Sequence, residues 1–484
     1  MMCWRFRSAI KPRWSQAPVL RSEPLPSEHL ASEHLPSRHL LSRHRGQRTW
    51  IFLCILLVLI GLGSCGKPAG QPTTTITLLC PGWVDKEFRD RREQEVAQFT
   101  GETRIQVKLL PGPESATEQL ALWRKLLEND TGTPDVYEID VIWPGTLAEY
   151  FLDLKPYLAQ DAVAHFPVLV ANDTVNGRLV AMPYHADAGL LFYRTDLLRQ
   201  YGYQGPPKTW DEMERMAARI QAGERAKGKK DFWGYVWEGA PSEALTCNGL
   251  EWQASEGGGR IIEEDRTISV NNPRTTFAWA RAARWTGSIS PPGVVAYKEW
   301  DAMNIWRSGN AVFMRNWTAA YLLSGAKESG VKGNFGVALP PNGQAGAASV
   351  LGGASLSVSR NSRHPQEAVA LVRFLCRRDV ELDRARITAQ APTLPELYDD
   401  LEVLKTSPYF SLLKQGFLSG AIARPSTVAG KQYGNVSEEY FKALHSVLTG
   451  ERSSPNAAAD LERELVRITG FKTKAAVSTR VQPR

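Results

Sequence analysis

Three tryptophans have polar or loop-forming neighbours near the ends of predicted strands. They are Trp143, Trp237 and Trp317, in the segments WPG, WEG and RNW. An indole ring can cover the C–H face of a sugar while carboxylates and amides bind the hydroxyl groups at its rim. Aromatic side chains also fill protein cores, where each buries about 150–250 Å². The pattern therefore predicts a carbohydrate site. It does not decide whether each of the three rings lies in the core or in that site.

Asp140 is the carboxylate to which the sequence most readily gives a binding role. It stands near the end of an apolar predicted strand at 136–143. A carboxylate there is costly unless it is paired or solvated in a cleft. Ligands of open α/β sheets bind at the carboxyl ends of the strands. We therefore predict that Asp140 lines a ligand cleft.

No catalytic motif accompanies these residues. The sequence has no G-x-G-x-x-G after a strand, no Walker A loop, no H-E-x-x-H pair and no G-x-S-x-G elbow. The four histidines after residue 65 are scattered, so no nucleophile is matched with a base. Glycosidase carboxylates have no short signature, and a pair such as Asp140 and Asp187 stays open. We expect no metal and no cofactor.

The first 65 residues are typical of an export signal. Ile51–Leu62 is uncharged and follows Arg43, Arg45 and Arg48. As a helix this run spans about 18 Å, less than the ~30 Å core of a bilayer, which favours a signal peptide over a short membrane anchor. The LGSC that ends at Cys65 resembles a bacterial lipobox. We expect an exported protein that is lipidated at Cys65 and faces the periplasm or the cell surface.

The charge distribution and the cysteine spacing argue against a nucleic-acid-binding or a metal-binding protein. The net charge is +7, but residues 1–65 hold nine Lys and Arg against three Glu, which leaves +1 for the remainder. Because the residues after 65 carry almost no excess of basic side chains, the protein is not expected to bind nucleic acid. Cys80, Cys247 and Cys376 are far apart and form no C-x-x-C pair. This spacing disfavours a metal site and leaves disulfide formation open.

Hydrophobic periodicity predicts alternating strands and helices. Strands are expected at 75–79, 103–110 and 136–143, with helices at 87–99 and 115–128 between them. This order is typical of a parallel α/β sheet. A second α/β stretch begins near residue 186, with strands at 189–193, 234–238, 311–314, 335–339 and 355–359 and helices at 209–221, 242–255, 274–285 and 302–307.

Six segments occur in an order that resembles a known family. They are DVYEIDVIWPGTLAEYFLDL, AMPYHADAGLLFYRTDLL, GYVWEGAPSEALTCNGLEW, GNAVFMRNWTAAYLL, VLGGASLSVSRNSRHPQEAVALVRFL and GFLSGAIARPSTV. From about Thr75 to Ile468 the chain resembles the trehalose/maltose-binding proteins of ABC importers, within family 1 of the extracellular solute-binding proteins. The resemblance implies an α/β fold of the periplasmic-binding-protein type II, with two discontinuous lobes joined by a hinge.

The expected domain organisation follows from that fold. The first lobe would comprise 75–185 and about 345–388, and the second lobe 186–344 and about 389–470. A leader with a low-complexity start at 1–65 and a tether at 66–74 would precede them, and a flexible tail at 471–484 would follow.

The resemblance also implies roles for single residues. Asp140 and Asp187 would accept hydrogen bonds from sugar hydroxyls, Trp317 would stack on a sugar ring, and Arg424 would donate hydrogen bonds. The other predicted contacts are Thr117, His185, Trp237, Glu243, Gly352 and Gly353.

One position departs from the family pattern. Trp usually follows Leu-Gly-Gly, whereas this chain has Ala354. By analogy with aromatic pairs, the missing ring removes about 1 kcal/mol or more of stacking energy. A disaccharide-like solute is therefore a firmer expectation than trehalose or maltose itself.

The function that we expect is binding without catalysis. A monomeric lipoprotein would capture the sugar between its lobes and deliver it to permease subunits driven by a cytoplasmic ATPase. Two alternatives stay open. One is a secreted carbohydrate-active enzyme that uses a carboxylate pair, and the other is a surface interaction protein with a vestigial cleft, which Ala354 slightly favours.

Overall fold

The computed structural model describes residues 74–82, 86–113, 116–129 and 131–474. The predicted leader with Cys65, nearly all of the tether and most of the tail lie outside the described residues. No helix within these ranges combines the length and the apolar character that a membrane span needs. Cys80, Cys247 and Cys376 are buried as free thiols.

The first β-sheet draws its strands from three separate stretches of the chain. Its order is β13-β12-β3-β1-β2, with β6 also paired to β12. β1 is parallel to β2 and β3, whereas β12 is antiparallel to β3 and β6. The strands are β1 (Thr74–Cys80), β2 (Ile105–Pro111), β3 (Val136–Asp140), β6 (Met182–Ala188), β12 (Ser349–Val358) and β13 (Ala421–Ile422).

The second β-sheet has the order β11-β7-β10-β8. β7 is antiparallel to β10 and β11, and β10 is parallel to β8. Its strands are β7 (Leu190–Arg194), β8 (Trp233–Val236), β10 (Ala311–Asn316) and β11 (Phe335–Ala338). All six residues of β10 are buried, as expected for a strand with helices on both faces of its sheet. Short pairs are formed by β4 (Thr174–Val175) with β5 (Arg178–Leu179) and β9 (Thr267–Ile268) with β14 (Lys472–Thr473).

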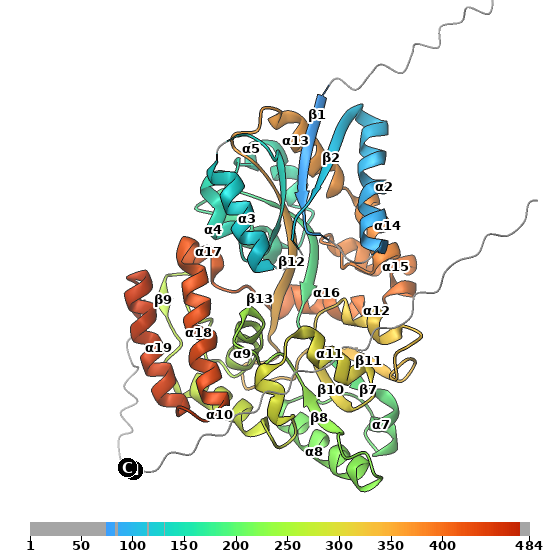
Figure 1. The fold of residues 1–484 in the computed structure, drawn as a ribbon, viewed down its shortest axis with the longest axis vertical. Coiled ribbons are helices and arrows are strands. Elements are labelled where there is room, and N and C mark those ends of the chain that lie inside the picture. Colours follow the sequence, from blue (N-terminus) through green and yellow to red (C-terminus); the bar gives the residue numbers. More distant parts are fainter. Residues whose placement is uncertain (1–73, 83–85, 114–115, 130, 475–484) are drawn as a thin grey trace, which may run out of the picture. The chain divides into compact units, whose positions relative to one another are not determined.

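Helices cover both sheets. Figure 1 shows β1, β2, α2 and α13 at one end of the described chain and β8, α7 and α8 at the other. Helices before the second sheet are α2 (Lys86–Thr103), α3 (Ala116–Glu128), α4 (Pro144–Leu147), α5 (Lys155–Ala162) and α6 (Pro167–Asn172). Those of the second α/β stretch are α7 (Thr195–Gln200), α8 (Trp210–Ala226), α9 (Glu243–Ser255), α10 (Pro273–Trp285), α11 (Glu299–Arg307) and α12 (Ala320–Gly325).

The last part of the chain adds strands to the first sheet and packs helices against those of the second α/β stretch. After β12 come α13 (Pro365–Leu375), α14 (Arg378–Thr388), α15 (Leu401–Thr406), α16 (Phe410–Ser419), α17 (Ser426–Ala429), α18 (Tyr433–Leu448) and α19 (Ser454–Thr469), and the 3-10 turns are η1 (Ala148–Tyr150), η2 (Pro292–Ala296), η3 (Pro395–Asp399) and η4 (Gly430–Gln432). α13 and α14 pack on α2 beside the first sheet, whereas α18 packs on α9 and α10. We therefore propose that α13 and α14 belong to the first lobe and α18 and α19 to the second.

The chain passes between the sheets close to the predicted boundary at residue 185. β6 ends at Ala188 in the first sheet and β7 begins at Leu190 in the second, so the first passage is at Gly189. The second passage lies between β11 and β12, and a third leads from β13 in the first sheet to α18, which packs on α9 and α10. Gly189 N donates to Val350 O at 3.1 Å, so the first passage lies beside the start of β12, where the second passage ends.

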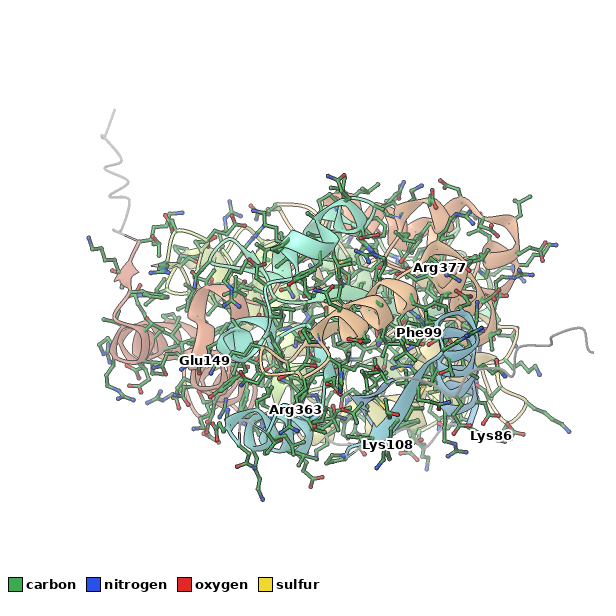
Figure 2. All side chains as sticks on the ribbon, turned by 90° about the horizontal axis from the view of Figure 1, so that it is seen from above. Lys86, Phe99, Lys108, Glu149, Arg363 and Arg377 are labelled. Carbon is green, nitrogen blue, oxygen red and sulfur yellow. The ribbon has the colours of Figure 1, made fainter. Side chains whose placement is uncertain are left out.

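Figure 2 views the described chain from above and labels charged side chains of this part of the molecule. Lys86, Lys108, Glu149 and Arg363 are exposed. Phe99, labelled among them, is buried and packs against Phe374 of α13 with ring centroids 5.4 Å apart.

Candidate functional site

Three strands bring the first candidate residues into one row. In the register of the first sheet Ala354 of β12 lies opposite His185 of β6 on one side and Asp140 of β3 on the other. Residues opposite each other across antiparallel strands project from the same face. A cavity of about 300 Å³ opens on this face, lined by Pro81, Phe88, Gln119, Glu138, Ile139, Asp140, His185, Gly353, Ala354 and Gln390.

Asp140 is a partly exposed hydrogen-bond acceptor at the end of β3. Its Oδ1 accepts a hydrogen bond from Ile142 N at 3.0 Å, which bends the chain into the turn after the strand. Burial raises the pKa of Asp140, and the nearby Arg424 guanidinium partly offsets that rise. The carboxylate therefore has spare acceptor capacity for a hydroxyl group in the cavity.

Asp187 of β6 and Trp317, which follows β10, meet beside Gly352, two residues along β6 and β12 from the His185–Ala354 pair. Asp187 Oδ1 accepts hydrogen bonds from Ala188 N at 2.7 Å and from Thr318 N at 3.0 Å, which anchors the segment that carries Trp317. Asp187 pairs in register with Gly352. A Cβ on Gly352 would lie 2.9 Å from Trp317 Cζ3 and 3.1 Å from Asp187 Cβ, so only glycine leaves room for this contact. Burial raises the pKa of Asp187 to about 6.

Gly353 allows the irregular course of β12 beside the cavity. Its φ is +110°, a conformation that glycine adopts easily. A Cβ there would lie 2.2 Å from His185 O. The predicted glycine pair is thus required by the close packing of β12 against β6 and against Trp317.

Arg424 reaches the same region from the C-terminal segment. It is almost fully buried, and its Nη2 donates to Leu351 O at 3.1 Å. Its Nη1 donates to Glu243 Oε1 at 2.9 Å, and Glu243 also accepts a hydrogen bond from Tyr433. Glu243, at the start of α9, therefore orients Arg424 beside β12.

His185 is a neutral group in this row. Burial, with the positive charges of Arg384 and Arg92, lowers its pKa to about 3. An uncharged imidazole can exchange one hydrogen bond in each direction with a hydroxyl group. Among the described residues no group of three or more potential ligands could hold a metal ion. The row suits a neutral, hydroxylated ligand.

Two predicted contacts need correction or lie beyond the described atoms. Trp237 is fully buried in the hydrophobic core beside the second sheet, where its Nε1 donates to Ser290 Oγ at 3.1 Å and its ring meets Trp252 edge-on. The interpretation of Trp237 as a sugar contact is wrong for this structure, because apolar packing encloses the ring. Thr117 lies in α3, and its side chain is outside the described part, as is Cys65.

The cavity also contains residues that sequence reasoning missed. Glu138 stands two positions before Asp140 on β3, where strand alternation could have found it, and its Oε2 accepts from Arg92 at 2.8 Å. Phe88 lies in the first turn of α2. Gln390 follows α14, and no local pattern brings it to the sheet. Glu138 and Gln390 add polar side chains to the lining of the cavity, and Phe88 adds an aromatic ring.

Comparison with known proteins identifies the family. Residues 86–380 match the bacterial extracellular solute-binding protein family. A probable ABC transporter-binding protein of Deinococcus radiodurans is 44% identical over 417 residues, which cover 85% of this chain and 98% of that protein.

Solved structures share the two-lobed α/β fold, which confirms the predicted fold class. T. maritima MalE3 with bound maltose is 34% identical, with a TM-score of 0.73 over 82% of this chain and 100% of that one. A Thermotoga lettingae solute-binding protein with bound α-D-tagatose is 22% identical, with a TM-score of 0.71 over the same shares, and supports the fold alone.

Proposed function

This chain belongs to the bacterial extracellular solute-binding protein family, a family without enzymatic activity, and from that premise we propose that it binds a disaccharide resembling trehalose or maltose for an ABC importer. The observation that carries the proposal is the convergence of Asp140, Asp187, Trp317 and Arg424 on one short segment of β12. The maltose in the T. maritima relative supports the same ligand class. The prediction that the protein is not an enzyme is confirmed by the family.

Binding uses stacking and hydrogen bonds only. One sugar ring lies on the Trp317 indole, and Asp187 accepts from its hydroxyls. Successive residues of a strand rise about 3.4 Å, so the Asp140–Ala354–His185 row is about 7 Å from Gly352, a separation suited to a second ring. Arg424 donates hydrogen bonds from the segment that follows β13. A ligand that contacts both lobes biases them toward closure.

The methyl group of Ala354 leaves the second position without an aromatic platform. Phe88 supplies an aromatic ring to the lining of the same cavity, and Glu138, Gln119 and Gln390 supply polar side chains. Recognition there depends on hydroxyl geometry more than on stacking. The proposal is therefore for a disaccharide-like solute, with maltose and trehalose as the first candidates.

The partners follow from the family role. The protein would hand the sugar to membrane permease subunits powered by a cytoplasmic ATPase, as a monomer held at the cell envelope by a lipid on Cys65. Radioactive palmitate incorporation that is lost in Cys65→Ala would support the anchor. Incorporation that persists in that variant would contradict it.

Calorimetry with trehalose, maltose and sucrose tests the sugar proposal. We expect saturable heat with at least one of them and recovery of the intact sugar afterwards. Absence of heat with all three sugars and with polyols would contradict the proposal. Released glucose would contradict the non-enzymatic role.

A further inference from the structure

A buried ion pair lies directly behind Trp317. Arg315 on β10 and Glu251 on α9 are both at most 1% exposed. Arg315 Nη2 donates to Glu251 Oε1 at 2.7 Å and Nε donates to Oε2 at 3.1 Å, a bidentate arrangement that fixes the plane of the guanidinium. The Arg315 Cζ lies 4.1 Å from the centroid of the Trp317 ring. Arg315 therefore supports the indole through a cation–π contact.

The same pair contacts the first passage between the sheets and the start of β12, where the second passage ends. Glu251 Oε1 accepts from Val350 N of β12 at 3.1 Å. In the first passage, a Cβ on Gly189 would lie 1.8 Å from Glu251 Oε1 and 2.4 Å from Arg315 Nη2. Ser349 Oγ also donates to Gly189 O at 2.7 Å. One ion pair thus touches the Trp317 indole, Gly189 between the two sheets and the first residues of β12.

We propose that Arg315 and Glu251 are positioning residues for sugar binding, which hold the Trp317 indole in place and couple it to the first passage between the lobes and to the start of β12, where the second passage ends. The inference rests on the proposed function, because it assumes that Trp317 carries a sugar ring. Neither residue lines the cavity. Each acts through Trp317, and a sugar that settles on the indole is thereby linked to the segments around Gly189 and Val350.

The positioning claim can be tested by fluorine NMR on the full-length protein labelled with 5-fluorotryptophan. The Trp317 resonance is the one that disappears in Trp317→Phe. We expect Arg315→Lys to shift or broaden this resonance without ligand, because lysine keeps the charge but loses the planar fork. The same variant should weaken binding of maltose or trehalose about tenfold, chiefly through faster dissociation.

Arg281→Lys is the matched control. Arg281 is also buried in the second lobe, pairs with Glu256 at 2.5 Å and lies 5.6 Å from the Trp210 ring, but it does not contact Trp317. This variant should move the Trp210 resonance and change sugar affinity by less than about twofold. The proposal is overturned if Arg315→Lys leaves the Trp317 resonance and the affinity unchanged, or if Arg281→Lys alters them equally.

Glu251→Gln provides a second variant if Arg315→Lys does not fold. Its amide oxygen can still accept from Val350 N, and Glu238, whose Oε2 lies 3.5 Å from Arg315 Nη1, still faces the guanidinium. We expect a smaller shift of the Trp317 resonance and a smaller loss of sugar affinity than in Arg315→Lys. An unaltered Trp317 resonance would contradict the proposal. If the unaltered protein binds neither sugar, the proposed function fails, whereas the ligand-free resonances still decide whether the pair positions Trp317.

Discussion

Acidification should release the sugar through Asp187. Burial raises the pKa of this carboxyl group from 3.8 to about 6 in the folded protein. The ionised form accepts hydroxyl hydrogen bonds better than the neutral acid, so protons and sugar compete. With a pKa of about 6, roughly one molecule in eleven is ionised at pH 5, and the apparent affinity should fall about tenfold between pH 8 and pH 5.

The stability of the sugar-free protein should respond in the opposite direction. A carboxyl group with a raised pKa destabilises the fold while it is charged. As the pH falls from about 6 toward 4, the folded protein binds a proton at Asp187 before the unfolded chain does, and this group's contribution to stability rises. The two-unit difference corresponds to at most about 3 kcal/mol. Loss of affinity at pH 5 is then distinct from acid unfolding.

Titration calorimetry at pH 8, 7, 6 and 5, at constant ionic strength, measures this effect. Asp187→Asn is the control, since its amide oxygen can still accept from Ala188 and Thr318. We expect weaker but much less pH-dependent binding in the variant. Burial also raises the pKa of Asp140, so Asp140→Asn is measured in parallel and should keep the Asp187 component. A flat affinity from pH 8 to pH 5, or an unchanged slope in Asp187→Asn, would refute the reasoning.

Other substitutions distinguish residues of the binding site from residues of the hydrophobic core. Asp140→Ala should weaken sugar binding by roughly 1–3 kcal/mol with little loss of thermal stability, because it removes a hydroxyl acceptor; an unchanged calorimetric Kd would exclude a direct contact. Trp317→Ala should weaken binding by about 1 kcal/mol or more, whereas Trp237→Ala should lower the free energy of unfolding by about 3–5 kcal/mol by opening a core cavity; chemical denaturation and calorimetry on both variants would reveal a reversed pattern. Gly353→Ala should destabilise the protein and abolish binding, because its Cβ would strike His185 O; a native melting temperature with a native Kd would contradict the packing argument.

Much of the fold could be predicted because strands and helices here have strong periodic patterns. The expected strand at 75–79 is found as β1, and the helix at 209–221 is found as α8 with Thr209 at its N-cap. Boundaries moved where tertiary pairing decides them. β12 begins at Ser349, well before the predicted 355, because its first half pairs with β6 and β13. β6 itself was not predicted, since MPYHADA mixes polar and apolar residues.

The site was only partly accessible to residue reasoning. Asp140 could be singled out because a carboxylate in an apolar strand is costly. Asp187, Gly352 and Arg424 came from the family resemblance, because their proximity depends on pairing between distant segments. Trp237 has a polar neighbour in sequence, yet Glu238 is itself buried and bonded to Asn248. Neighbours in sequence therefore did not report the surroundings of that ring.

A crystal structure of the protein grown with the sugar that gives the largest calorimetric heat tests the central claim most directly. The account predicts one sugar ring on the Trp317 indole, hydroxyls within hydrogen-bond distance of Asp140, Asp187 and Arg424, and the second ring in the cavity beside Ala354. A sugar bound elsewhere, or one that contacts a single lobe and leaves Trp317 free, would contradict it.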